Sequence, residues 1–145
     1  MSVAEHHGGR LHEAARRWGI PVSDWLDLST GISPWAWPVP ALPESVWRRL
    51  PEDDDGLGGL CRQWLTVPEA AGCLPVPGSQ AALQLLPRLR SVSRVGVPSP
   101  GYREHALAWQ REGHSVVPLA AEQIDAALPD LDVLVCINPN NPTGH

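Results

Sequence analysis

The sequence predicts an α/β fold with a mainly parallel sheet. The main sign is a regular alternation of strand-like and helix-like segments in the second part of the chain. Strand-like runs at 73–76, 94–97, 115–119 and 132–137 alternate with helical patterns at 79–89, 102–112 and 122–128. Strands separated by helices form βαβ units, whose strands run parallel. The chain has 145 residues, of which 43% are hydrophobic, so it is large enough to bury a core.

The beginning of the chain follows a different pattern, with one helix and a proline-rich arm. Leu11, Ala14, Ala15 and Trp18 recur at helical spacing, and Gly19 ends that helix. A short strand is expected at 25–29, a loop at 30–43, a short helix at 43–50 and an amphipathic helix at 57–65. We therefore expect two parts, an N-terminal helix with an extended arm at 1–50 and an α/β part at 51–145.

Composition and charge exclude several classes of protein. A net charge of −5 argues against a nucleic-acid binder. No run approaches the roughly 18 apolar residues that a membrane helix needs, and the first ten residues lack the apolar core of a signal peptide. Three widely separated cysteines, with no CxxC pair and no metal-ligand spacing, favour a reducing cytoplasm and no metal site.

Ligands of open α/β sheets gather in the loops after the strands, and the first such loop here suits a phosphate. In residues 76–80, Gly78 permits a tight turn and a helix begins at Ser79. The free N–H groups and the helix dipole at that point favour an anion. The alternative is that Ser79 only caps the helix.

The second and third loops offer an aromatic ring and an amide. Tyr102, the only tyrosine, follows a proline-stiffened turn at 98–101, where its ring could stack on a planar cofactor, and His105 lies one turn along on the same face. Core packing of Tyr102 and a partly exposed His105 are the alternatives. In residues 138–145, two Asn–Pro steps fix the backbone, and Asn141 can donate a hydrogen bond to a phenolate-like oxygen. A disordered tail is the alternative there.

Together the three loops resemble those of fold type I pyridoxal-phosphate (PLP) enzymes of the class I/II aminotransferase group. PGSQAALQ, SPGY and INPNNPTG are similar to the phosphate-binding, ring-stacking and O3′-binding loops of that group. Three further stretches resemble the threonine-phosphate decarboxylases of cobalamin biosynthesis: HHGGRLHEAARRWGIPVSDWLDLSTGISP, GYREHALAWQREGHSV and RRLPEDDDGL. The resemblance runs over nearly all of the chain but covers less than half of a family member. It therefore implies an N-terminal fragment of such an enzyme.

The resemblance implies a three-layer α/β/α sandwich and a set of cofactor contacts. Residues 51–145 would form the first part of the PLP-binding large domain, and 1–50 would belong to the small domain and close the site. Gly78, Ser79 and Gln80 would bind the PLP phosphate. Tyr102 would stack on the pyridine ring with His105 near the same face, and Asn141 would hydrogen-bond O3′. The arm would contact the substrate through His7, Gly8, Gly9, Gly31 and Ile32.

The chain also departs from the family pattern. All eleven of its Lys and Arg residues are arginines, so the Schiff-base lysine is absent and the chain cannot complete the reaction by itself. Leu50 stands where relatives commonly carry a tyrosine that reaches the PLP phosphate of the neighbouring subunit, which puts that contact of the expected homodimer in doubt.

The implied reaction is the decarboxylation of O-phospho-L-threonine to aminopropanol phosphate, a small phosphorylated amino acid being the expected partner. A histidinol-phosphate-type aminotransferase is the alternative enzyme. A non-catalytic, truncated remnant is the alternative of another class, and an unrelated α/β domain with coincidental loops is a third. The reading frame beyond the codon for His145 would separate a partial record from a shortened gene.

Overall fold

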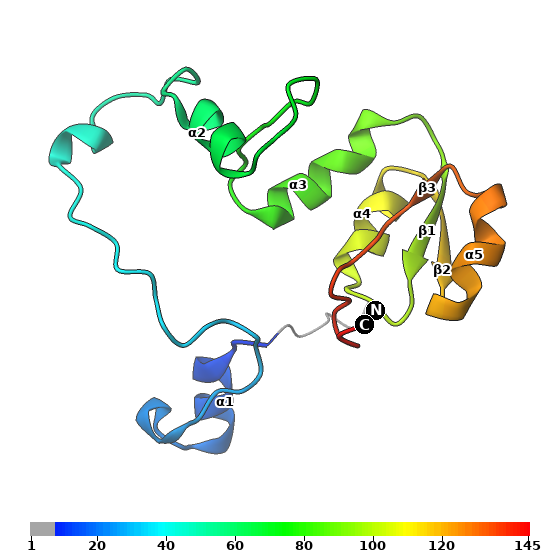
Figure 1. The fold of residues 1–145 in the computed structure, drawn as a ribbon. Coiled ribbons are helices and arrows are strands. Elements are labelled where there is room, and N and C mark those ends of the chain that lie inside the picture. Colours follow the sequence, from blue (N-terminus) through cyan, green and yellow to red (C-terminus); the bar gives the residue numbers. More distant parts are fainter. Residues whose placement is uncertain (1–7) are drawn as a thin grey trace. The chain divides into compact units, whose positions relative to one another are not determined.

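The computed structural model describes residues 8–145, and the chain divides into two compact units between Leu50 and Pro51. The first unit holds helix α1 (Leu11–Trp18) and the 3₁₀ turns η1 (Val22–Asp24) and η2 (Glu44–Trp47). The second unit holds helices α2 (Leu57–Trp64), α3 (Ser79–Leu85), α4 (Glu104–Arg111) and α5 (Ile124–Ala127), the 3₁₀ turns η3 (Leu86–Leu89), η4 (Ala121–Gln123) and η5 (Leu128–Asp130), and strands β1 (Arg94–Pro98), β2 (Ser115–Leu119) and β3 (Val133–Leu134). Figure 1 shows each of them in chain order.

Helix α1 forms where the apolar spacing predicts it. Ala15 is buried, and Leu11 and Ala14 on the same face are half-buried. The helix ends because Gly19 adopts a left-handed φ of 66° and donates its N–H to the carbonyl of Ala15. The predicted helix at the start of the chain is thus confirmed.

Two expectations for the rest of this unit are wrong. Residues 25–29 form no strand, because Asp27 Oδ1 accepts hydrogen bonds from the backbone N–H of Ser29 at 2.9 Å and from its hydroxyl at 2.6 Å. This Asx-type turn bends the chain and replaces the ladder that a strand would need. The helix predicted at 43–50 is only the 3₁₀ turn η2.

The sheet of the second unit is wholly parallel, with the strand order β2-β1-β3. Strand β1 lies between the other two, which is why its residues Val95 and Val97 are buried at 0% and 4% exposure. They pack with Trp109 of α4 in one core cluster. Gly96 is needed between them, since a Cβ there would lie 2.6 Å from Cδ1 of Leu131 and 2.8 Å from Cδ1 of Leu119.

Helices flank the sheet on both sides: α3 and α4 lie on one side and α5 on the other in Figure 1. This three-layer arrangement confirms the α/β class with a parallel sheet. The details differ in three places. Residues 73–76 form no strand, β3 is only two residues long, and α3 passes into η3 at Leu86 because Pro87 has no N–H for an α-helical bond.

A buried histidine joins three elements at the far end of α4. His114 is 6% exposed, and its Nδ1 accepts the N–H of Ser93 at 3.1 Å while its Nε2 lies 3.0 Å from the carbonyl oxygen of Pro87. Because Ser93 donates to Nδ1, the proton must sit on Nε2, which donates to Pro87. The ring also packs edge-on against Trp109, with the two ring centroids 4.7 Å apart. His114 therefore closes the end of η3 and the start of β1 onto α4.

Within residues 8–145, no helix has both the length and the apolar character to span a bilayer. The same part of the chain contains no group of three or more His, Cys, Asp and Glu side chains arranged to hold a metal ion.

Candidate functional site

The loops after β1 and β3 lie side by side because these two strands are hydrogen-bonded neighbours. The chain passes from β1 to β2 on one side and returns across β1 to β3 on the other, so their carboxyl ends form a switch point in the strand order. Such points are where open α/β sheets bind ligands. In Figure 1 the end of the chain lies near the loop that joins β1 to α4.

A direct hydrogen bond joins the two loops. The side-chain Nδ2 of Asn140 donates to the carbonyl oxygen of Pro100 at 2.9 Å. The same nitrogen donates to Thr143 Oγ1 at 2.7 Å, and the N–H of Gly144 donates to the carbonyl of Asn140 at 2.6 Å. The loop that follows β3 is therefore folded onto itself and anchored to the loop that carries Tyr102, rather than being a free tail.

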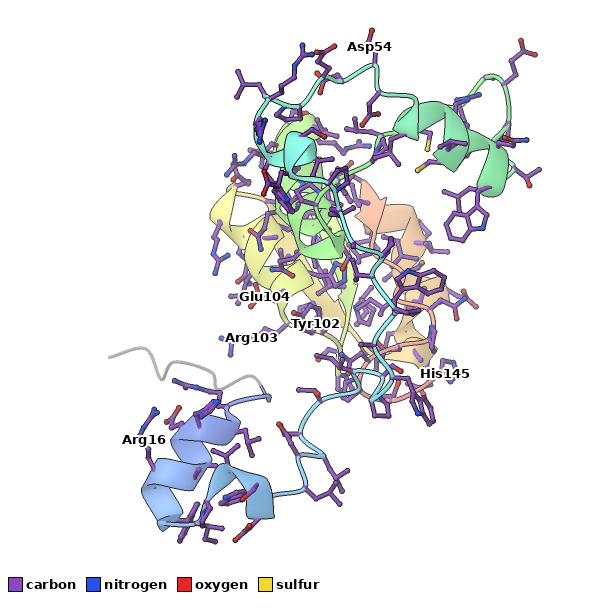
Figure 2. The ribbon with its side chains drawn as sticks, turned by 90° about the vertical axis from the view of Figure 1, so that its left-hand side faces the viewer. Arg16, Asp54, Tyr102, Arg103, Glu104 and His145 are labelled. Atoms are coloured by element: carbon purple, nitrogen blue, oxygen red, sulfur yellow. The ribbon has the colours of Figure 1, made fainter. Side chains whose placement is uncertain are left out.

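Tyr102 and His105 line a cavity of about 290 Å³ at this edge of the sheet. Both side chains are half-buried, and their rings meet edge-on with centroids 6.1 Å apart. Figure 2 shows Tyr102 beside Arg103 and Glu104 at the beginning of α4. Its lining also includes Ile137 and Pro142 from the loop after β3. The cavity is thus bounded by both loops, and its volume lies at the lower end of the sizes, about 300–1,000 Å³, that are typical of small-ligand sites.

We expect the pKa of His105 to lie below that of an ordinary histidine. Burial lowers the pKa of His105 from its ordinary value of 6.5, because desolvation disfavours the charged imidazole. The unfolded chain then binds more protons than the folded one just below pH 6.5, so the contribution of His105 to stability falls as the pH drops through that window. A proton NMR titration checks this, with His105→Gln identifying the resonance; a pKa at or above 6.5 in the folded protein contradicts it.

The beginning of α3 is joined to the same site through α4. Gln80 Nε2 donates to Glu104 Oε2 at 3.4 Å, so the side chain of Gln80 reaches the first turn of α4, close in sequence to Tyr102. Gly78 is the residue that caps α3, with a φ of 87° and no side-chain cap. Ser79 is therefore the first helical residue and not the cap, which leaves its hydroxyl and the first N–H groups of the helix available to an anion.

Asn141 is exposed and lies between the anchored Asn140 and Pro142, which lines the cavity. Asn141 itself is not among the residues that line that cavity. The structure thus brings Tyr102 and His105 together and links Gln80 to the first turn of α4 through Glu104, but it does not bring Asn141 into contact with them.

In the first unit, a close contact joins the glycine pair to the turn that precedes Gly31. The N–H of Gly9 donates to Ser29 Oγ at 2.8 Å, and a Cβ on Gly8 would lie 2.0 Å from the carbonyl oxygen of Ser29. Gly31 and Ile32 follow Ser29 after Thr30 and are exposed, while His7 lies outside the described residues. The hydrogen bonds from Ser29 lower the pKa of Asp27 and keep its carboxylate charged.

The sequence reasoning missed Asn140 and Ser29. Asn140 stands beside Asn141 in NPNNP, and both carry the same amide, so the sequence offered no means of telling which one anchors the loop. For Ser29 a signal existed, because Asp-x-Ser is a common Asx-turn pattern, but the alternation of apolar and polar residues in WLDLS favoured a strand.

Comparison with known proteins gives three clear relatives, and no family model matches the chain. The chain is 54% identical over 96% of its length to a threonine-phosphate decarboxylase from Pseudomonas aeruginosa. It is 41% identical over its whole length to one from a Sinorhizobium species, and 29% identical over 95% of its length to one from Salmonella typhimurium. The chain spans only 41–44% of the length of these relatives. The resemblance expected from the sequence is confirmed: by sequence, this chain is a relative of proteins named threonine-phosphate decarboxylase.

Proposed function

We propose that this chain forms the N-terminal part of a PLP-dependent enzyme that decarboxylates O-phospho-L-threonine in cobalamin biosynthesis. The observation that carries the proposal is the meeting of two loops, those after β1 and β3, around one cavity that Tyr102 and His105 line. The names of the three relatives support the reaction. The chain is proposed to be inactive alone, since it has no lysine to hold the cofactor.

The described residues fit such a cofactor. The cavity beside Tyr102 has room for a flat ring, and the uncapped beginning of α3 offers N–H groups to a phosphate. When bound, PLP supplies an electron sink for the charge that develops on the substrate. Gly78, Ser79 and Gln80 would hold its phosphate, and Tyr102 would pack on its ring. Asn141 would donate its amide N–H to the ring oxygen and favour the charged form of that oxygen.

His105 would stand at the edge of that ring. Its imidazole is edge-on to Tyr102, and the lowered pKa keeps it neutral near neutral pH. A neutral ring there would place no positive charge beside the cofactor's ring.

The first unit would supply substrate contacts and close the site as part of the small domain, while 51–145 would belong to the large domain. The backbone of Gly31 and Ile32 would meet the substrate carboxylate, and His7, Gly8 and Gly9 its phosphate side. The contact between Ser29 and the glycine pair supports this, since it holds the two groups of residues together within the unit. A homodimer is proposed from kinship alone, and Leu50 argues for a weaker cross-subunit phosphate contact than relatives make.

A cytoplasmic location is proposed as well. Cys61, Cys73 and Cys136 are all free thiols in the structure, and Cys136 is exposed. Unpaired cysteines are typical of proteins in a reducing compartment.

The reaction is tested with the full-length product of the gene that encodes this chain. Incubation with PLP and O-phospho-L-threonine is expected to release carbon dioxide and leave aminopropanol phosphate. Amino transfer to 2-oxoglutarate without carbon dioxide would favour the histidinol-phosphate-type aminotransferase instead. A product that ends at His145 and shows neither reaction would favour the non-catalytic remnant.

Replacing Tyr102 by alanine in that full-length protein should weaken PLP binding. An aromatic stacking partner contributes about 0.5–1.5 kcal/mol beyond burial, so the dissociation constant should rise by roughly 2- to 13-fold. Tyr102→Phe keeps the ring and should bind PLP almost as well as the unaltered protein. The measurement is a titration of the apoprotein with PLP. Equal affinities for the alanine and phenylalanine variants would remove Tyr102 from the site.

A further inference from the structure

Both the side chain and the backbone of Asn140 make hydrogen bonds that hold its loop in place. Its Nδ2 donates to the carbonyl of Pro100, 40 residues earlier in the chain, at 2.9 Å, and to Thr143 Oγ1 at 2.7 Å. Its backbone N–H donates to the carbonyl oxygen of His145 at 2.7 Å, and its own carbonyl accepts the N–H of Gly144 at 2.6 Å. One residue therefore closes the 140–145 turn and attaches that turn to the loop after β1.

The orientation of the Asn140 amide is fixed by its acceptors. Pro100 offers only a carbonyl oxygen, so the group that faces it must be the NH₂. As a result Oδ1 points elsewhere, and it is shielded from solvent without a hydrogen-bond partner among residues 8–145. A buried acceptor left unpaired destabilises the folded state. The chain tolerates this cost to keep the two donor contacts, which indicates that the contact between the loops is the important one.

The two loops that Asn140 joins carry the groups proposed to hold the cofactor ring. Pro100 precedes Gly101 and Tyr102, and a Cβ on Gly101 would lie 2.4 Å from the carbonyl oxygen of Pro98, so this loop has little freedom of its own. On the other loop, Asn141 follows Asn140 directly, and Pro142 lines the same cavity as Tyr102. The hydrogen bond from Asn140 to Pro100 thus joins the loop of Tyr102 to the loop of Asn141 and Pro142, and Pro100 itself lines that cavity.

We propose that Asn140 is a positioning residue that sets the separation between Tyr102 and Asn141, and thereby the width of the slot for a flat ring. What the slot binds rests on the proposed function. The effect of Asn140 on the separation of the two loops does not depend on that function. Asn140 itself would not touch the ring. It would act through the two loops, by holding Tyr102 on one loop and Asn141 on the other where each can contact the ring.

The sharpest test replaces Asn140 by aspartate in the full-length protein, with Asn138→Asp as the matched control. Aspartate keeps the shape of the side chain but offers no N–H, so two oxygens would face each other at Pro100. Asn138 is exposed on the same loop, and its side chain makes no hydrogen bond within the described part of the chain. Both variants add the same charge two residues apart, but only Asn140→Asp removes the amide donor that contacts Pro100 and Thr143.

Tyr102 reports the result, because its ring lies on one of the two loops that Asn140 joins. Fluorotyrosine is incorporated into the full-length protein, and the ¹⁹F resonance of Tyr102 is identified as the one that Tyr102→Phe removes. Asn140→Asp should shift, broaden or split that resonance without PLP, while Asn138→Asp should leave it unchanged. An unchanged resonance in Asn140→Asp, or an equal change in both variants, overturns the inference whatever the protein binds.

PLP titration then separates this inference from the proposed function. The dissociation constant should rise about tenfold in Asn140→Asp and less than twofold in Asn138→Asp. If the unaltered protein binds no PLP, the proposed function fails while the fluorine result still decides the positioning role. If PLP binds Asn140→Asp as tightly as Asn138→Asp, the positioning role fails while the proposed function stands.

A gentler pair of variants covers the case in which Asn140→Asp does not fold. Thr143→Val removes the hydroxyl that accepts from Asn140 Nδ2 and from the N–H of His145, and keeps the shape of the side chain. It should change the fluorine resonance in the same direction by a smaller amount. Thr143→Ser keeps the hydroxyl and should restore the original resonance; a serine variant that behaves like the valine variant contradicts the proposal.

Discussion

Replacing His114 by alanine is expected to lower the free energy of unfolding by about 3–5 kcal/mol. The substitution leaves the N–H of Ser93 without its partner, and the carbonyl of Pro87 keeps only the long hydrogen bond from the N–H of Arg90 at 3.4 Å; Ser93 and Pro87 are both buried. It also removes a ring that packs edge-on against Trp109 at 4.7 Å. An unpaired N–H, a weakened carbonyl contact and a cavity therefore arise at one place. Thermal or urea unfolding of the purified protein measures the effect.

Two further variants separate the hydrogen bonds from the packing. In His114→Asn, the amide oxygen can take the place of Nδ1 and still accept from Ser93, so about half of the loss should remain. His12→Ala, at an exposed position on α1, should change stability by less than about 0.5 kcal/mol. If His114→Ala were no worse than His12→Ala, the proposed bridge between η3, β1 and α4 would be wrong.

Gly101→Ala should produce the largest local effect on the site. The new Cβ would lie 2.4 Å from the carbonyl oxygen of Pro98 and 3.1 Å from its carbon, so backbone rather than a flexible side chain must move. The strain is expected to cost about 1–3 kcal/mol. Because Tyr102 is the next residue, its ring should move with the loop, and PLP affinity in the full-length protein should fall by more than about tenfold.

Gly72→Ala is the matched control for this change. A Cβ on Gly72 meets nothing within 4 Å, and its φ is not positive, so alanine fits there without strain. It should be neutral or slightly stabilising through its effect on the unfolded chain. Equal losses of PLP affinity in the two variants would show that the loop before Tyr102 has no special constraint.

The order of helices and strands in the second unit could largely be predicted from the sequence. Its apolar runs and helical spacing are local properties, and β1, β2, α3 and α4 appear where those patterns place them. The strand expected at 25–29 failed because the local turn of Asp27 with Ser29 bends the chain there. The strand expected at 73–76 failed for a non-local reason, because no neighbouring strand among the described residues supplies its hydrogen bonds. Likewise, β3 is short because only Val133 and Leu134 pair with β1.

For the candidate site, the sequence identified which loops carry the chemistry but not how they meet. PGSQ, SPGY and NPNNPTG stand out by their residues, since glycine, proline, tyrosine and asparagine have distinct chemical uses in a loop. The contact of Asn140 with Pro100 and that of Gln80 with Glu104 join residues 40 and 24 positions apart. No periodicity in a single sequence encodes a pairing at such separations.

By itself, then, the sequence determined the alternating α/β pattern, the absence of lysine and the residues at three strand-end loops. Only the tertiary structure decided that β3 lies next to β1, in the order β2-β1-β3, and that Asn140 rather than Asn141 attaches one loop to the other. The physical reason is that apolar spacing fixes which face of an element is buried, whereas strand order and contacts between loops depend on how all the elements pack together.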